Sequence, residues 1–366
     1  MDIRAAVARA PGAPFTIEAA TLEDPRPGEV RVRIVGVGLC HTDLVARDQF
    51  IPIPLPAVLG HEGSGVVESV GDGVTKVAPG DHVVLSFASC GHCGRCEADL
   101  PGYCRDFPAL NFSGARADGT SGVRIGGQPV SANFFGQSSF ASHALASERN
   151  VVKAPKSAPL ELLGPLGCGF QTGAGGVMRS MACPAGSTIA VFGGGPVGLA
   201  GVMGAKVQGC RTIILVEPIA ARRRLALELG ATHAIDPSTE DVGATIRGVV
   251  PEGVDFAFET SGVLAAAEAA LASLGSHGLL GLVGVPPRPD SSLNINLAGL
   301  ITFGHRVMGI IEGDSDIDGF ISDLISLHLA GRFPIDRLVT TFPLAQINEA
   351  IEAQRLGECV KAVLLP

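Results

Sequence analysis

The chain has 366 residues, of which 46% are hydrophobic and 17% are charged, and its formal net charge is −9. This length allows about two domains with cores of ordinary size. The acidic balance and the lack of a Lys/Arg stripe disfavour a protein that binds nucleic acid. No apolar run reaches the ~18 residues of a membrane helix, so we expect no membrane association. The N-terminal stretch lacks a signal-peptide pattern, and we therefore expect a cytoplasmic protein.

Residues 1–88 are rich in short β-type segments separated by glycine turns. Residues 30–35 alternate apolar and polar side chains, as a half-buried strand does. Residues 36–43 are expected to end a strand and to open a helical turn. Residues 59–68 place glycines around a His–Glu pair, where the backbone can approach closely. The sequence thus predicts a mostly β domain with the shape of a partly open barrel.

Four cysteines lie within fifteen residues, at spacings of three, three and eight. A compact Gly-rich loop of this kind supplies the four soft ligands of a tetrahedral zinc, each about 2.3 Å from the metal. Four protein ligands leave no open position for a substrate, so we expect a structural metal. Two disulfides are the alternative, but they suit a small secreted domain, and no signal peptide is present. The expected ligands are Cys90, Cys93, Cys96 and Cys104.

Beyond about residue 160 the pattern changes, because short apolar runs begin to alternate with helical stretches. The first run is β-branched and typical of a buried parallel strand. Such alternation predicts parallel βαβ units. The expected strands cover 187–192, 212–217, 254–258 and 279–283, and the expected helices cover 219–230 and 264–274.

A glycine-rich motif joins the first of these strands to the next helix. Its glycines allow a tight turn and admit a pyrophosphate, and the helix N-terminus offers unpaired amides to phosphate. Glu217, at the end of the second strand, would bind ribose hydroxyls and repel a 2′-phosphate, which favours NAD over NADP. Arg222 and Arg223 follow closely and weaken that preference; a packing turn without ligand is the alternative. The motif consists of Gly193, Gly194, Gly195, Pro196, Val197 and Gly198.

Two single cysteines in glycine-flanked turns, Cys40 and Cys168, and His61 form a second candidate set. Together they would make a Cys₂His zinc site whose fourth position stays open for water or an alcohol. Each of them is also compatible with an ordinary buried residue, because free cysteine is among the most buried residue types. The residues alone leave both readings open.

Several motifs occur together in the order found in one enzyme family. They are GLCHTD (38–43), GHEGSGVVESVG (60–71), the four-cysteine lobe (90–104), CGFQTG (168–173), GGGPVG (193–198) and VGVPP (283–287). With these motifs the chain resembles, over essentially its whole length, a zinc-dependent alcohol dehydrogenase of the medium-chain dehydrogenase/reductase family. The aryl-alcohol (benzyl alcohol) branch is the most similar.

This resemblance implies an α/β fold in which a GroES-like, Gly-rich β-barrel catalytic domain carries an inserted Rossmann domain, a doubly wound parallel sheet. The expected bounds are 1–165 for the catalytic domain, 166–305 for the Rossmann domain and 306–366 for a segment that returns to the catalytic domain. The active site is expected in the cleft between them, at the carboxyl ends of the parallel strands.

The resemblance also implies that Cys40, His61 and Cys168 ligate a catalytic zinc. Thr42 would take the alcohol proton toward the nicotinamide ribose, although an ordinary helix cap is its alternative role. Asp43 would accept the second ring N–H of His61, as carboxylates behind metal-bound histidines do. Glu62 would lie behind the metal.

For the cofactor, the resemblance places two cations, His41 and Lys361, near the pyrophosphate, although a lysine near a terminus is usually only solvated. Thr172 and Val285 would lie against the nicotinamide. The remaining cysteines, Cys183, Cys210 and Cys359, are interpreted as small apolar packing residues.

One position departs from the family pattern. Its best-studied members have a histidine five residues after the first zinc-ligating cysteine, and this chain has Val45 there. The proton relay must then end at the ribose hydroxyl, at water or at another base. The pocket residues implied by similarity are Ile51, Ser86, Phe134, Phe135, Val285 and Ile311. Because most are apolar and two are aromatic, a bulky aryl or allylic primary alcohol is the expected substrate.

The family uses an apolar late strand, here residues 300–303, to form dimers, so we expect a homo-oligomer, either a dimer or a tetramer. Within the family, a glutathione-dependent formaldehyde dehydrogenase or a polyol dehydrogenase is the alternative. The sequence does not offer the charged pocket anchors that either would need. A zinc-ribbon nucleic-acid binder and a member that has lost catalysis are further alternatives. The acidic charge argues against the first, and the retained Cys40, His61 and Cys168 argue against the second.

Overall fold

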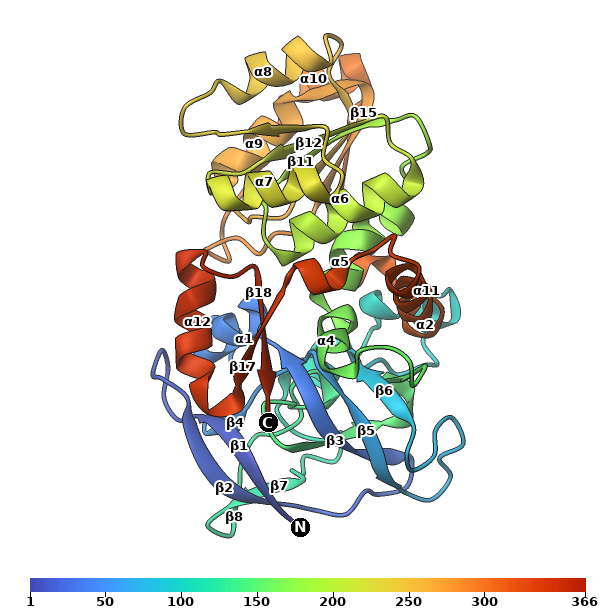
Figure 1. Ribbon diagram of the computed structural model, residues 1–366, viewed down its shortest axis with the longest axis vertical. Coiled ribbons are helices and arrows are strands. Elements are labelled where there is room, and N and C mark those ends of the chain that lie inside the picture. Colours follow the sequence, from blue (N-terminus) through green and yellow to red (C-terminus); the bar gives the residue numbers. More distant parts are fainter. The chain divides into compact units, whose positions relative to one another are not determined.

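The computed structural model describes residues 1–366 (Figure 1). The chain divides into two compact units. The first consists of residues 1–168, 316–330 and 335–366, and the second of residues 169–315 and 331–334. The expected division at 305 is too early, because β16 (Arg306–Gly309) pairs in parallel with β15 (Leu274–Leu282) and so belongs to the second unit.

The first unit is mostly β, as expected. One sheet has the strand order β4-β1-β2-β7-β8, and the other β10-β6-β5-β3-β18-β17, with β9 also paired to β3. The strands are β1 (Asp2–Ala8), β2 (Thr16–Leu22), β3 (Glu29–Gly38), β4 (Ala57–Val58), β5 (Gly63–Val70), β6 (His82–Leu85), β7 (Val123–Ile125), β8 (Gln128–Pro129), β9 (His143–Ser147), β10 (Val151–Ala154), β17 (Val339–Pro343) and β18 (Lys361–Leu365).

The end of the chain returns to this unit and completes the sheet. Strand β18 pairs antiparallel with β3, with Val363 opposite Gly38, and Figure 1 shows the red strand beside the blue one. Since α1 (His41–Arg47) begins just after β3, this pairing brings the start of β18 next to the start of α1. The other helices of this unit are α2 (Gly94–Glu97), α3 (Phe107–Phe112), α4 (Leu160–Leu163), α11 (Ile317–Leu329) and α12 (Ile347–Leu356).

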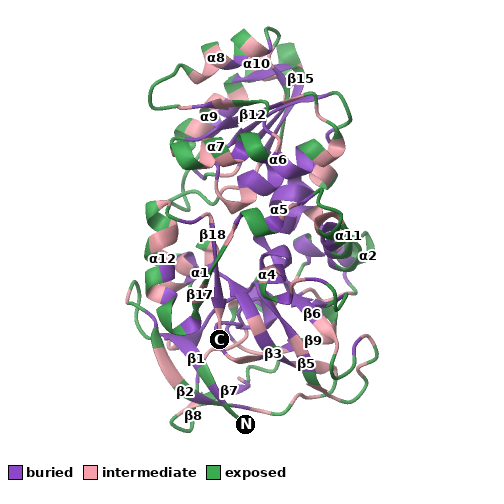
Figure 2. Ribbon diagram, in the orientation of Figure 1, coloured by how far each residue is buried: buried purple, intermediate pink, exposed green.

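The second unit contains a six-stranded parallel sheet in the order β13-β12-β11-β14-β15-β16. Every residue of β11 (Thr188–Phe192) is buried, as expected for a parallel strand with both faces covered. Figure 2 shows the buried strands and the exposed outer sides of α7 and α8. The remaining strands are β12 (Thr212–Val216), β13 (His233–Ile235) and β14 (Val254–Glu259). The helices are α5 (Gly169–Gly175), α6 (Pro196–Gln208), α7 (Ala220–Leu229), α8 (Val242–Val249), α9 (Leu264–Ala272) and α10 (Leu297–Phe303).

The expected strand at residues 300–303 is wrong, because these residues lie in α10. The Asn296 side chain caps this helix by accepting from Gly299 N at 3.0 Å, and Gly304, at φ 63°, ends it in the left-handed conformation. Apolar periodicity over four residues does not distinguish a strand from a helix. Here the cap at Asn296 favours the helix.

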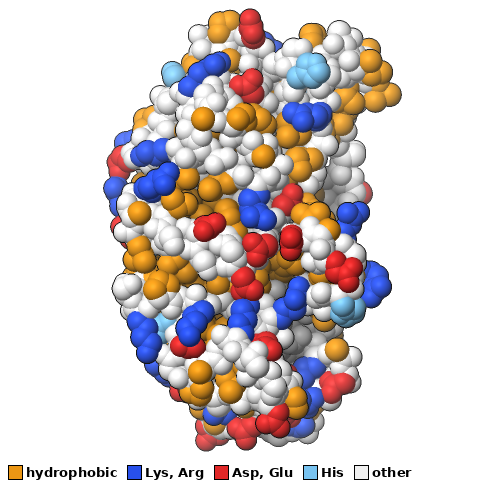
Figure 3. All heavy atoms as spheres, turned by 90° about the vertical axis from the view of Figure 1, so that its right-hand side faces the viewer, with side chains coloured by type: hydrophobic (Ala, Val, Ile, Leu, Met, Phe, Trp, Pro, Cys, Tyr) orange, Lys and Arg blue, Asp and Glu red, His pale blue; other side chains and the backbone are white.

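None of the helices is both long and apolar enough to cross a membrane. On the face drawn in Figure 3, Lys and Arg lie among Asp and Glu and form no continuous basic patch.

Candidate metal centres and dinucleotide site

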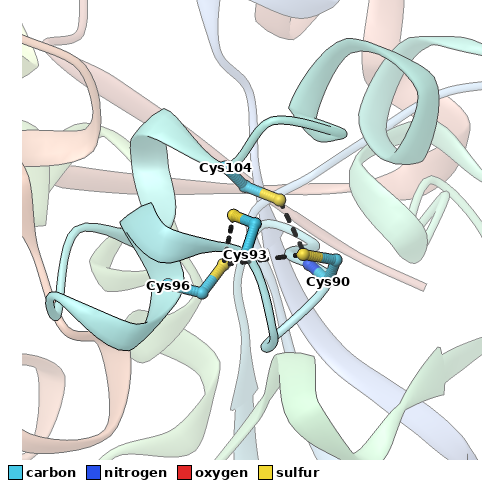
Figure 4. Close-up of side chains that lie close together, drawn as sticks. All are labelled: Cys90, Cys93, Cys96 and Cys104. Atoms are coloured by element: carbon cyan, nitrogen blue, oxygen red, sulfur yellow. Dashed lines mark hydrogen bonds between the residues drawn. The ribbon is translucent and has the colours of Figure 1, made fainter.

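The four cysteines of the lobe turn their sulfurs toward one another (Figure 4), and all four Sγ atoms lie within 4.8 Å of one another. Gly91, at φ 82°, makes the first bend, and Cys93 caps the short helix α2 that carries Cys96. No cysteine of the chain is in a disulfide, so the disulfide alternative is not what the structure shows. Backbone N–H groups lower the pKa of Cys93 to about 6, whereas burial raises that of Cys104 to about 12. Four converging sulfurs fit a tetrahedral zinc without an open position.

A second cluster lies in the first unit, where the ligand atoms of Cys40, His61, Glu62 and Cys168 lie within 4.8 Å of one another. Cys40 is the N-cap of α1, His61 precedes β5, and Cys168 ends a 3₁₀ turn over residues 164–167. The Nε2 atom of His61 is buried and has no hydrogen-bond partner. An orphaned imidazole nitrogen beside two thiols fits a Cys₂His zinc site.

Asp43 organises this cluster from behind. Its Oδ1 lies 2.8 Å from His61 Nδ1 and accepts from Gly60 N at 3.1 Å, while Oδ2 accepts from Cys40 N at 2.9 Å. Because Asp43 is fully buried, these bonds compete with no water. The carboxylate therefore fixes the Nδ1–H tautomer and leaves Nε2 for the metal. This is the contact expected for Asp43.

Glu62 forms a buried ion pair with Lys361, whose Nζ lies 2.5 Å from Glu62 Oε2 and donates to Leu39 O at 3.0 Å. Gly38 of β3 allows this approach, since a Cβ at this position would lie 1.9 Å from Glu62 Oε2. Burial raises the pKa of Glu62 to about 7, even though Lys361 opposes the shift. In the structure the Lys361 ammonium is thus paired with Glu62. The contact of Lys361 with a pyrophosphate stays a prediction.

The surrounding charges favour the thiolate form of Cys40, which a metal ligand requires, but they also favour a protonated His61, which must release that proton when a metal binds. A hydrogen bond with Cys168, supported by the charges of His61 and Lys361, holds the pKa of Cys40 well below the ordinary value of a thiol against the effect of burial. Burial opposes a charge on His61, but the neighbouring Asp43 and Cys40 raise its pKa well above the ordinary value. A thiolate held at neutral pH is the form that binds a metal.

The first turn of α1 carries the other predicted catalytic positions. Thr42 Oγ1 lies 3.7 Å from Cys40 Sγ, and Cys40 occupies the N-cap, so Thr42 is not the helix cap. His41 is exposed at the first position of the helix, and Val45 is buried. The aliphatic side chain of Val45 offers no proton acceptor at that position.

The predicted pocket residues differ in their surroundings. Phe134 and Phe135 are buried against His61. Ser86 is fully buried and donates to Gly167 O at 2.6 Å. Ile51 is half-buried in the first unit, whereas Val285, which is exposed, and Ile311 belong to the second.

Sequence reasoning missed Gln137, a buried residue behind His61. Its Nε2 donates to His61 O at 2.9 Å and to Ser86 O at 3.2 Å, and its Oε1 accepts from Gly63 N at 3.1 Å. The side chain therefore ties together the backbone on both sides of the metal cluster. A Gln–Ser–Ser stretch after a glycine has the composition of a surface loop, so no local signal indicates this role.

The dinucleotide motif has the expected form in the second unit. Gly193 makes the turn at φ 99°, and a Cβ on Gly198 would lie 1.8 Å from Gly193 O, so helix α6 packs as closely as a glycine allows. Glu217 Oε2 accepts from Gly194 N at 2.6 Å and Oε1 accepts from Ile219 N at 2.8 Å. The acid thus lies directly behind the loop. Thr172 is buried on α5, and its Oγ1 lies 3.4 Å from Glu312 Oε2.

Arg222, whose predicted role concerned the cofactor, is on α7, next to Arg223. The latter side chain is engaged within its own unit, with Nη2 2.8 Å from Asp236 Oδ2 and Nη1 2.7 Å from Glu217 O.

Two known protein families match the two parts of the chain. Residues 26–156 match the family described as the alcohol dehydrogenase GroES-like domain, and residues 196–326 match the zinc-binding dehydrogenase family. The chain is 48% identical over 367 residues to a geraniol dehydrogenase of Castellaniella defragrans, with 100% of this chain and 98% of the relative covered. The chain belongs to the zinc-dependent alcohol dehydrogenases. Zinc and a nicotinamide dinucleotide are the cofactors of this family.

Two solved structures are similar to the chain over its whole length. An alcohol dehydrogenase zinc-binding domain protein from Burkholderia ambifaria is 52% identical, with a TM-score of 0.98. The match covers 100% of this chain and 99% of that protein. A benzyl alcohol dehydrogenase from Acinetobacter calcoaceticus is 41% identical with a TM-score of 0.96 and the same coverage.

Proposed function

We propose that this alcohol dehydrogenase oxidises a bulky apolar primary alcohol, aryl or allylic, to its aldehyde with NAD. The observation that carries the proposal is the cluster of Cys40, His61 and Cys168, with His61 Nε2 unpartnered beneath two phenylalanine rings. An apolar aromatic wall beside a metal centre suits a substrate with a planar apolar group. Relatives named for geraniol and benzyl alcohol support the same substrate class.

Cys40, His61 and Cys168 would hold the zinc, which would act as a Lewis acid toward the alcohol oxygen. Asp43 keeps the His61 ring oriented toward that metal. Thr42, whose Oγ1 lies 3.7 Å from Cys40 Sγ, would accept the alcohol proton and pass it toward the nicotinamide ribose. Because Val45 cannot continue the relay, the proton would leave through the ribose hydroxyl, through water or through another base. The four-cysteine lobe would hold a second zinc, which is structural.

We infer a preference for NAD from Glu217. Its carboxylate lies at the end of β12 with both oxygens directed to backbone amides of the adjacent loops. An acid at this place binds the ribose hydroxyls of NAD and repels the 2′-phosphate of NADP. The guanidinium of Arg223, which would otherwise compensate a phosphate, is paired with Asp236.

The test is the initial rate of NADH formation with geraniol, benzyl alcohol, ethanol and the glutathione–formaldehyde adduct, repeated with NADP. We expect kcat/KM for the first two alcohols to exceed that for ethanol, and NAD to exceed NADP. Cys40→Ser should abolish turnover, whereas Cys210→Ser, in the second unit, should retain it. A preference for the glutathione adduct would move the enzyme to the formaldehyde branch. Turnover of none of the four would overturn the substrate class.

We also propose a cytosolic homo-oligomer that forms through α10 and β16. Strand β16 is the last in the sheet, so its outer edge is unpaired, and the apolar residues Leu297, Ile301 and Phe303 are exposed beside it on α10. Unpaired edges and exposed apolar patches are typical of subunit interfaces. Light scattering of the purified chain should give the mass of a dimer or a tetramer, and Ile301→Lys should reduce the measured mass. A monomer mass for wild type would refute the oligomer.

A further inference from the structure

His61 is held by aromatic rings on two sides. Phe135 stacks on the imidazole with the ring centroids 4.3 Å apart and 22° between the planes. Phe134 meets it edge-on, at 5.3 Å and 88°. The bond from His61 Nδ1 to Asp43 restrains one ring atom, but a single hydrogen bond still leaves some rotation of the imidazole about its Cβ–Cγ bond. A flat ring packed on the face of the imidazole blocks this rotation.

Phe135 reaches this position through an unusual backbone. Its φ of 51° and ψ of 32° lie in the left-handed region, where a bulky side chain is an outlier. Glycine would suit the position better, yet a large ring is present. Strained residues of this kind persist where the surroundings over-determine them, and they are concentrated at functional sites. The contact of the Phe135 ring with His61 is therefore a candidate for the function that maintains this strain.

The turn that carries Phe135 is anchored to the segment that carries His61. Ser139 N donates to Gly60 O at 2.9 Å, Ser138 Oγ donates to Val58 O at 2.6 Å, and Gln137 donates to His61 O. These bonds hold the backbone of residues 58–61 and the turn in one register. The backbone that carries Phe135 therefore cannot move away from His61 without breaking buried hydrogen bonds.

A continuous group of rings supports Phe135 from behind. Phe112 contacts it edge-on at 5.4 Å and 76°, and Phe107 contacts it at 6.2 Å and 88°. Phe112 also contacts Phe134 at 6.4 Å, but it makes no ring contact with His61. The group thus contains rings that touch the metal ligand and rings that do not, which allows a matched comparison.

We propose that Phe135 is a positioning residue of the metal centre. Its ring keeps His61 Nε2 directed toward Cys40 and Cys168 and excludes water from that nitrogen, and both effects slow the release of the metal. This inference rests on the proposed zinc site. Residues that orient a metal ligand from behind typically change metal affinity by about 10–100-fold when they are replaced.

The experiment compares Phe135→Leu with Phe112→Leu in the full chain loaded with zinc. Each variant removes one ring of the same group and keeps an apolar side chain; Phe135 is buried and Phe112 is half-buried. Zinc release to a chromogenic chelator is followed at a temperature where circular dichroism shows both variants folded. The chain is then reloaded with Co²⁺, whose visible bands report the coordination of the thiolates and the imidazole independently of any turnover.

We expect Phe135→Leu to release one of two zincs at least about tenfold faster than wild type and to alter the cobalt bands. Phe112→Leu should leave both unchanged. Phe135→Gly should release zinc as fast as the leucine variant, because it removes the ring while suiting the left-handed backbone. This variant keeps the test decisive if strain prevents the leucine variant from folding. Wild-type release and bands in the Phe135 variants would overturn the inference.

Failure of the proposed function would look different. Wild-type protein with a single zinc per chain would remove the catalytic metal site and this inference with it. Two zincs without turnover of any alcohol would overturn the substrate proposal and leave the role of Phe135 to be decided by the release rates.

Discussion

Lys361 and Glu62 form an ion pair inside the first unit, with 2.5 Å between Nζ and Oε2 and no more than 1% of either side chain exposed. The pair joins β18, near the end of the chain, to the residue that follows the predicted metal ligand His61. A cation buried this completely depends on its partner, because neither charge has water as an alternative. The last strand is therefore tied electrostatically to the metal cluster.

Replacement of Lys361 should show this dependence. Lys361→Met removes the ammonium but keeps the apolar stem, so Glu62 is left buried without its cation, and we expect a loss of about 3 kcal/mol in the free energy of unfolding. The double variant Glu62→Gln/Lys361→Met should recover at least half of it. Urea denaturation followed by circular dichroism measures both values. The surface pair Lys153–Asp81 is the control, and Lys153→Met should cost less than about 1 kcal/mol. Equal stability of the single and double variants would contradict the coupling.

Asp43→Asn should weaken zinc binding at His61. The amide cannot accept from His61, Cys40 N and Gly60 N as the carboxylate does, so we expect affinity for one of two zincs to fall about 10–100-fold. Competition with a chelator of known affinity measures it. Asp48→Asn is the matched control, because Asp48 is exposed at the other end of α1. Equal zinc affinities of the two variants would argue that Asp43 does not orient the ligand.

The four-cysteine lobe should bind its metal independently. Cys96→Ser removes one of four converging sulfurs, and we expect the zinc content to fall by one per chain and the thermal midpoint to drop, because a structural metal contributes to folding stability. Atomic absorption and calorimetry give the two readouts. Cys210→Ser should keep both zincs. A Cys96→Ser chain with an unchanged zinc content would mean that the lobe holds no metal.

Glu259 should make the stability of the second unit depend on pH. Burial raises its pKa above the ordinary 4.5, although hydrogen bonds from Ser261 and Gly262 oppose the shift. A raised pKa means that the folded state binds the proton more tightly than the unfolded state does. The resulting stabilisation is complete below pH 4.5 and is lost as the pH rises through the pKa of the folded state.

The measurement is the thermal midpoint between pH 4.5 and 7 for wild type and Glu259→Gln. The absolute midpoint of the variant will shift, because its amide replaces an acceptor near Gly262 N, so the comparison is of slopes. Wild type should lose more stability with rising pH than the glutamine variant does. Parallel curves would show that Glu259 does not titrate differently in the folded state.

Much of the fold follows from local sequence. The β-rich first part, the alternation beyond residue 160 and the strand–glycine–helix motif are all present as predicted, because each depends on periodicity or glycine placement within a few residues. The errors are at residues 300–303 and at the boundary at 305. A four-residue apolar run does not reveal its period, and a strand that pairs with a distant neighbour does not mark its domain.

The sequence by itself determined the four-cysteine lobe and the dinucleotide loop, since in both a short stretch of chain carries the residues and the glycines that bend it. Only the tertiary structure decided that Cys40, His61 and Lys361 meet, because their convergence depends on how β3 pairs with β5 and with β18. It also decided that Phe135 stacks on His61. Local preference argues against a left-handed phenylalanine, and only the packing of the surrounding chain stabilises it there.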